Sequence, residues 1–60
     1  MKTVIIAYEQ ISPAVLETII CKAFPQSCCM WEDMDEDYFE FTVCCCPDLD
    51  MLEDLLAEYM

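Results

Sequence analysis

The stretch that most constrains the fold is residues 27–46, which read SCCMWEDMDEDYFEFTVCCC. Two apolar, aromatic and thiol-rich runs flank an acidic patch at residues 32–37. Apolar runs on either side of a polar break predict a β-hairpin. We therefore expect a hairpin with a strongly negative tip, connected through Asp35, Glu36 and Asp37.

Side-chain alternation along the two strands sets the register of this hairpin. One face receives the aromatic residues and is the expected core face. Its cross-strand pairs are Asp33 with Phe39, Trp31 with Phe41 and Cys29 with Val43. The opposite face carries Met34 beside Tyr38, Glu32 opposite Glu40, Met30 opposite Thr42 and Cys28 opposite Cys44. A slip by one residue would separate Trp31 from Phe41, so burial selects this register or one shifted by two residues.

The other segments predict one strand and two helices. β-branched residues predict a first strand over Lys2–Tyr8. A helix is expected over Pro13–Ala23, because Ser12 can cap it and proline suits its first turn. A similar start signal at Pro47, followed by carboxylates, predicts a second helix that runs to the terminus. The apolar stripes expected to pack on the sheet are Val15, Leu16, Ile19, Ile20 and Ala23, and then Leu49, Leu52, Leu55, Leu56 and Tyr59.

This element order predicts a single α+β domain over residues 1–60. A right-handed crossover makes the first two strands parallel, with the third between them, so the expected strand order is 1-3-2 with both helices on one face. The arrangement resembles a ferredoxin-like split βαβ unit that lacks its last strand, a resemblance of topology that carries no functional residues. The first strand then has an unpaired edge with no charge over residues 3–7, which predicts a homodimer.

Charge restricts the partners that this chain can bind. Its 60 residues, with 58% hydrophobic content, allow one small core, and the net charge is −11. The chain has 13 acidic residues and only two basic ones, Lys2 and Lys22. Direct binding to nucleic acid or to an anionic membrane surface is therefore electrostatically disfavoured. We expect the partner to be a basic protein surface.

Several functional classes lack their sequence signals. There is no histidine and no glycine, hence no phosphate-binding glycine loop, so we predict neither an enzyme nor a cofactor. The residues Asp33, Asp35 and Asp37 alternate, but the glycine and distal glutamate of a calcium loop are missing. No secretory signal and no membrane span are predicted, so we expect a cytoplasmic protein with free thiols.

The leading functional hypothesis is an acidic inhibitor that mimics nucleic acid. The magnitude of this chain's net charge, 11, exceeds the roughly 2 to 8 that solubility requires of a small domain. Such a protein, of the kind that viral or mobile-element genes encode, would block a basic nucleic-acid-binding surface. The residues predicted to contact the partner are Glu32, Asp33, Asp35, Glu36, Asp37, Tyr38 and Glu40. The plainer interpretation is a solvated surface that keeps the core soluble.

Two other hypotheses remain at this point. Cys28, Cys44 and Cys46 could bind a soft ion such as Cu(I), or a cross-strand thiol pair could form a redox disulfide. The simpler interpretation of these cysteines is that they behave as small hydrophobic residues. The third hypothesis is a structural subunit that assembles through the edge of the first strand.

Overall fold

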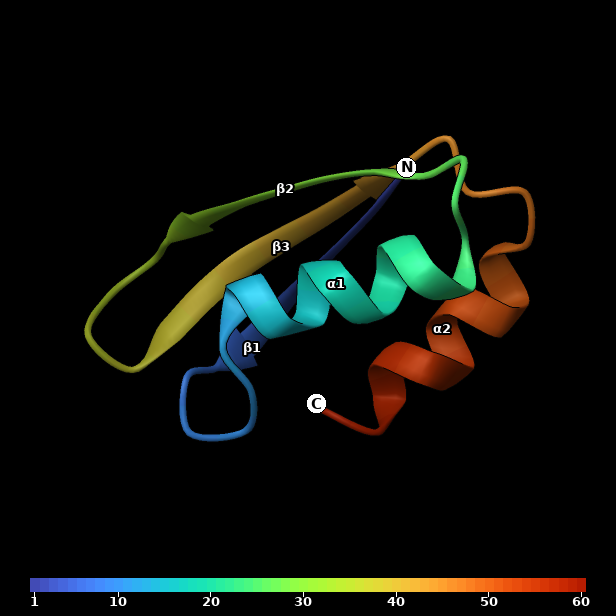
Figure 1. Ribbon diagram of the computed structural model, residues 1–60. Coiled ribbons are helices and arrows are strands. Elements are labelled where there is room, and N and C mark those ends of the chain that lie inside the picture. The colour runs from blue at the N-terminus through green and yellow to red at the C-terminus, as the bar shows by residue number, and fades with distance from the viewer.

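Three strands and two helices follow one another in the order predicted from the sequence. The computed structural model describes residues 1–60 and has the order β-α-β-β-α (Figure 1). The elements are β1 (Lys2–Ala7), α1 (Pro13–Ala23), β2 (Cys28–Asp33), β3 (Tyr38–Cys44) and α2 (Leu49–Ala57). The predicted bounds of α1 are confirmed, and β1 ends one residue before the predicted Tyr8, which enters a turn.

The strands form one sheet in the predicted order β1-β3-β2. Strand β3 is antiparallel to both neighbours, so β1 and β2 run parallel to each other. The predicted hairpin register is confirmed at every pair. These pairs are Cys28–Cys44, Cys29–Val43, Met30–Thr42, Trp31–Phe41, Glu32–Glu40 and Asp33–Phe39. The alternation of apolar side chains therefore sets which face of each strand is buried, and the connection through the acidic tip distinguishes this register from one shifted by two residues.

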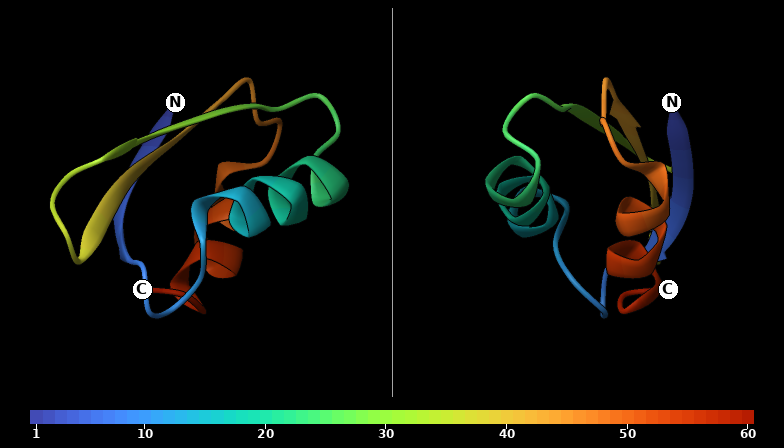
Figure 2. Two further views of the ribbon diagram at one scale, coloured as in Figure 1. Left: turned by 60° about the vertical axis from the view of Figure 1, so that its left-hand side comes forward. Right: turned by 90° about the vertical axis from the view of Figure 1, so that its right-hand side faces the viewer.

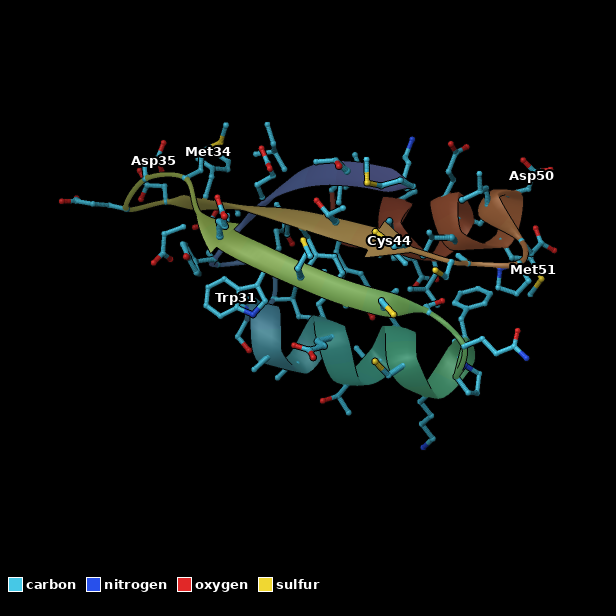
Figure 3. The ribbon with its side chains drawn as sticks, turned by 90° about the horizontal axis from the view of Figure 1, so that it is seen from above. Trp31, Met34, Asp35, Cys44, Asp50 and Met51 are labelled. Atoms are coloured by element: carbon cyan, nitrogen blue, oxygen red, sulfur yellow. The ribbon has the colours of Figure 1, made fainter.

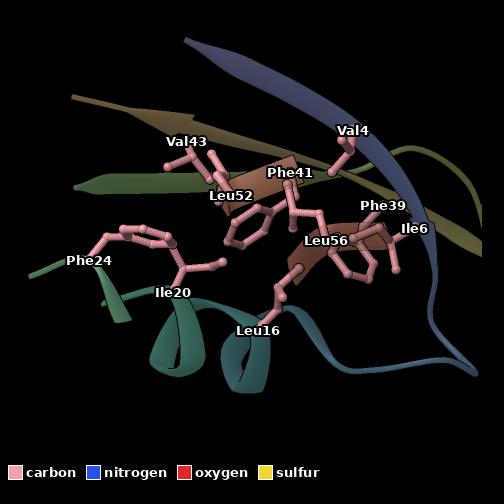
Figure 4. Packing of buried hydrophobic residues seen from close by; sticks show 10 residues of the cluster. All are labelled: Val4, Ile6, Leu16, Ile20, Phe24, Phe39, Phe41, Val43, Leu52 and Leu56. Carbon is pink, nitrogen blue, oxygen red and sulfur yellow. The ribbon is translucent and has the colours of Figure 1, made fainter. Parts of the chain in front are cut away.

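Both helices cover the same face of the sheet, as predicted, and leave the other face open (Figure 2). The core between sheet and helices holds ten buried hydrophobic residues (Figure 4). They are Val4, Ile6, Leu16, Ile20, Phe24, Phe39, Phe41, Val43, Leu52 and Leu56. Phe39, Phe41 and Val43 have no exposed surface, because β3 is the middle strand and both helices lie beneath it. The open side of the sheet is called the outer face below.

Helix α1 begins and ends at the predicted signals. The Ser12 hydroxyl accepts a hydrogen bond from the Val15 backbone N–H at 3.3 Å, which satisfies one of the free donors of the first turn. The helix ends before Pro25, a residue whose predecessor avoids helical geometry. Leu16 and Ile20 face the core, whereas Val15, predicted to belong to the apolar stripe, is exposed. The buried stripe is thus narrower than the sequence suggests.

Helix α2 differs from the prediction at both ends. Asp48 is the N-cap, and its carboxylate accepts a hydrogen bond from the Met51 N–H at 3.1 Å. Pro47 therefore precedes the cap and does not lie in the first turn, because the extended backbone of Asp48 separates it from the helix. The helix stops at Ala57, and Glu58 and Tyr59 form a final turn, so the prediction that it runs to the terminus is wrong.

Helix length also limits what these two helices can cover. With 11 and 9 residues, neither reaches the length that a membrane span requires.

The two helices also do not reach under the whole hairpin, which extends beyond the start of α1 (Figure 1). Consequently Trp31 points to the predicted core face but remains 39% exposed. Strand β2 has no fully buried residue.

Candidate protein-binding surface on the β2–β3 hairpin

The acidic tip of the hairpin is organised by one of its own carboxylates. Residues 34–37 connect β2 to β3, and Asp35 Oδ1 accepts hydrogen bonds from the backbone N–H of Asp37 at 2.7 Å and of Tyr38 at 2.9 Å. A side-chain acceptor of this kind closes a turn without glycine, and this sequence has none. Asp35, predicted as a contact residue, therefore has a structural role in the turn as well.

Two predicted contact residues meet on the outer face. Glu32 and Glu40 are directly opposite each other on neighbouring strands, and both are exposed. Exposed apolar side chains lie next to them on the same face: Met30, Met34 and Tyr38. The side chains of Met30, Glu32, Glu40 and Thr42, together with Trp31, line a shallow depression. This part of the sheet combines negative charge with apolar contact area.

The remaining predicted residues lie around the tip and do not share one plane. Asp33 is opposite Phe39 and so points to the helix side of the sheet, although it is exposed. Glu36 and Asp37 line an open depression where the tip meets the end of β1. Figure 3 shows Met34 and Asp35 at this end of the molecule and Asp50 and Met51 of α2 at the other. The hairpin therefore presents carboxylates on more than one side.

The tip depression includes one acidic residue that was not among the predicted contacts. Its lining residues are Ala7, Tyr8, Glu9, Glu36, Asp37 and Tyr38. Glu9 reaches this place because Ala7 pairs with Tyr38, which brings the end of β1 beside the hairpin tip. The predicted strand order, combined with a register for β1 against β3, would have revealed this proximity.

No hairpin carboxylate has a cationic partner within the chain. The single ion pair joins Lys2 Nζ of β1 to Glu53 Oε1 of α2 at 2.9 Å. Lys22 lies in the last turn of α1. Lys2 pairs with Val43, at the end of β1 that is remote from the tip, and Lys22 is remote from the start of α1, so neither lysine lies beside the tip. The negative charge of the hairpin is uncompensated.

The carboxylates of α2 contrast with those of the hairpin because several have structural partners. Asp48 caps the helix, and Glu53 pairs with Lys2. Asp50 lies in the first turn, where a negative charge interacts favourably with the helix dipole. Of the seven predicted hairpin contact residues, only Asp35 uses its side chain in a hydrogen bond within the chain. The hairpin carboxylates are therefore the better candidates for binding another molecule.

The cysteines of the alternative hypothesis are only partly brought together. Cys28 and Cys44 are direct cross-strand partners on the outer face. Opposite residues of antiparallel strands have Cα atoms about 4.5 to 5.5 Å apart, within the range that a disulfide spans. All six thiols are free, and the Cys46 thiol donates to the Asp48 carbonyl at 3.5 Å. The structure forms no group of three or more metal-ligating side chains, so the Cys28–Cys44 pair carries what remains of this hypothesis.

A second pair of neighbouring thiols, Cys21 of α1 and Cys29 of β2, lies where the helix packs on the sheet. Burial raises the pKa of Cys29 to about 12, and the nearby Cys21 thiol adds to the increase. A thiol with a raised pKa stays protonated and is a poor nucleophile. Cys21 and Cys29 become neighbours only when α1 packs on the sheet, so no local sequence pattern could indicate this pair. Cys29 therefore stays a protonated thiol at neutral pH.

Comparisons with protein-family models, with curated proteins and with solved structures find no match to this chain.

Proposed function

We propose that this protein is an acidic protein-binding module that occupies a basic, nucleic-acid-binding surface of a target protein. The observation that carries the proposal is the uncompensated charge of the hairpin, set beside exposed apolar side chains. Glu32 and Glu40 face the solvent as a directly opposed pair with no cation near them. The contact surface consists of the outer face near this pair together with the tip.

The opposed glutamates are easier to explain by binding than by folding. Like charges directly across a sheet destabilise it by roughly 0.2 to 1 kcal/mol. Solubility alone does not require carboxylates at opposed positions. An arginine side chain of a partner would relieve this repulsion, since a guanidinium binds carboxylates with two parallel hydrogen bonds. A basic partner would therefore bind the Glu32–Glu40 pair with a more favourable free energy than it would bind a single isolated carboxylate.

Exposed apolar side chains supply the second part of the contact. Met30 is 63% exposed and lies beside the glutamate pair, and Met34 and Tyr38 follow toward the tip. Methionine adapts to irregular surfaces, and tyrosine is enriched among the residues that dominate binding energy. Charge would accelerate the encounter, and these side chains would retain the partner.

This function requires no reaction and no cofactor. The protein would act as an inhibitor by excluding nucleic acid from its target, in the manner of small viral or mobile-element proteins that mimic nucleic acid. A reducing cytoplasm fits its free thiols. The proposal differs from a merely soluble acidic surface because it assigns the binding to one region of the molecule.

A pair of matched charge reversals tests the proposal. The double variant Glu32→Lys and Glu40→Lys changes the outer face. The control Asp54→Lys and Glu58→Lys makes the same net charge change at two exposed positions, one in α2 and one in the turn that follows it. Each variant and the parent serve as bait for nucleic-acid-binding proteins, and the captured protein is then assayed for loss of nucleic-acid binding. We expect the hairpin variant to bind at least about tenfold more weakly than the control. Equal weakening by both variants would show that total charge, and not this surface, attracts the partner.

A further inference from the structure

The sheet ends at β1 in a free edge. The Tyr8 N–H donates to the Asp37 carbonyl at 2.9 Å, and hydrogen-bonded positions alternate along an antiparallel strand. Thr3, Ile5 and Ala7 therefore direct their backbone N–H and C=O groups away from β3. Of these groups only the Ala7 carbonyl has a partner within the chain, the Gln10 N–H at 3.0 Å. These outward groups are called the β1 edge below.

The β1 edge lacks the features that usually prevent strands from pairing with other chains. Such features are inward or edge charges, prolines, bulges or a covering element. Strand β1 has one charged residue, Lys2, and its side chain is paired with Glu53 at 2.9 Å. Figure 2 shows β1 as the outermost strand on its side of the molecule. The opposite edge, β2, carries Glu32 and Asp33.

We propose that the β1 edge pairs with the β1 edge of a second copy of this chain, antiparallel and around a two-fold axis at Ile5. In this register the Ile5 N–H of each copy donates to the Ile5 carbonyl of the other. The Ala7 N–H of each copy donates to the Thr3 carbonyl of the other. The two sheets join into one continuous sheet, with both hairpins at its far ends.

Charge favours a second copy as the occupant of this edge. Residues 1–8 contain no carboxylate, and Lys2 is their one charged side chain. In the proposed register Lys2 of each copy lies opposite Tyr8 of the other, so no like charges meet. A strongly basic partner would find little to bind here, whereas another copy meets no opposed like charges along the strand.

Apolar contacts complete the self-complementary fit. Ile5 is 49% exposed on the outer face, and the two-fold axis sets it against Ile5 of the second copy. On the helix side, Val4 of each copy would lie opposite Ile6 of the other. Directly opposed β-branched side chains stabilise strand pairing. Each copy thereby covers the one large apolar side chain that β1 exposes.

Dimerisation and the proposed function can fail independently. Two copies of net charge −11 repel each other, so added salt should strengthen the dimer by screening. Salt should weaken the binding of a basic partner for the same reason. The two activities therefore respond to ionic strength in opposite directions.

Amide hydrogen exchange of the unmodified protein tests the proposed pairing. The Met34 N–H donates to the Tyr38 carbonyl at 3.1 Å, so the amides of Cys29, Trp31 and Asp33 point away from β3 at the β2 edge. As concentration rises from about 10 µM to about 1 mM, we expect the Ile5 and Ala7 amides to gain at least about tenfold protection. The β2 edge amides serve as the control within the same molecule and should stay unprotected. Protection at the β2 edge instead, or at neither edge, overturns the proposal.

A backbone variant provides the second measurement. Ile5→Pro removes the central N–H donor without removing a hydrogen bond to β3, and Ile5→Val retains it. By light scattering after size-exclusion chromatography, we expect the proline variant to dimerise at least about tenfold more weakly and the valine variant to resemble the parent. Circular dichroism establishes that both are folded. A folded proline variant that dimerises like the parent, or a parent that is monomeric at about 1 mM and moderate salt, contradicts the inference. If the proline variant does not fold, the exchange measurement on the unmodified protein decides.

Discussion

The two outer strands of the sheet, β1 and β2, are both edge strands but differ in almost every other respect. Val4 and Ile6 of β1 are buried, and the strand packs over the helix layer. No residue of β2 is fully buried, and its most apolar side chain, Trp31, is 39% exposed. The first strand contributes to the core, and the second presents most of its surface to solvent.

The physical reason for this difference is the limited area that two short helices can cover. Helix α2 lies against β1 and forms the Lys2–Glu53 ion pair with it. The hairpin extends past the first turn of α1 (Figure 1). In a chain of 60 residues the core cannot fill both sides of a sheet. One outer strand can therefore specialise in stability and the other in recognition.

Truncation of one large side chain on each edge strand should show the largest difference. Ile6→Ala removes a side chain that is 1% exposed and should cost about 2 to 5 kcal/mol, comparable to the whole stability expected of a domain this small. Trp31→Ala loses a partly exposed side chain and its edge-to-face contact with Phe39, at 6.4 Å between ring centroids, and should cost about 1 to 2 kcal/mol because the site is open to solvent and leaves no closed cavity. Urea unfolding of both variants measures the two losses. A loss for Trp31→Ala as large as that for Ile6→Ala would show that β2 is a core strand after all.

A smaller effect is expected at the hairpin tip, where β2 turns into β3. Asp35→Ala removes the acceptor of two backbone N–H groups and should lower the free energy of unfolding by about 1 kcal/mol. Asp35→Asn retains an acceptor and should recover most of this loss. Glu36→Ala removes the same charge from the tip and, with no hydrogen bond in the turn, should leave thermal unfolding unchanged. If both alanine variants unfold at the same temperature, Asp35 does not hold the turn.

The effect that is smallest at neutral pH concerns the Cys29 thiol on β2. Its pKa is raised by burial to about 12 in the folded protein, from an ordinary value of 9.0 in the unfolded chain. Between these values the unfolded chain releases a proton that the folded protein retains. Stability from this group is therefore complete below about pH 9 and declines as pH rises toward 12.

The matching measurement compares the parent with Cys29→Ala by urea unfolding across this alkaline range. The variant should lose the part of the pH dependence that Cys29 contributes. At pH 8, mass mapping after alkylation should show Cys29 modified more slowly than the exposed Cys28 and Cys45, because only the thiolate reacts. Equal rates at all three positions would mean that the thiol is not shielded by α1.

Much of the fold follows from local patterns that act over a few residues. Ser12 and the proline after it define the start of α1, and alternation along the hairpin specifies which side chains share a face. Alternation together with a connection at the acidic tip places Glu32 opposite Glu40. These predictions hold because capping and strand periodicity depend on neighbouring residues and on one buried face.

Other features needed the tertiary structure because they depend on segments distant in the chain. The exposure of Trp31 reflects how far the helices reach, and the position of Glu9 beside the tip reflects the pairing of β1 with β3. The Cys21–Cys29 neighbourhood exists only after α1 packs on β2. The amino-acid pattern by itself determined the elements and the two faces of the hairpin, because capping and side-chain alternation act between neighbouring residues. Only tertiary packing decided that Glu53 gained Lys2 as an ion-pair partner while the hairpin carboxylates gained no cation, because charge pairing between distant segments depends on distances that no local pattern encodes.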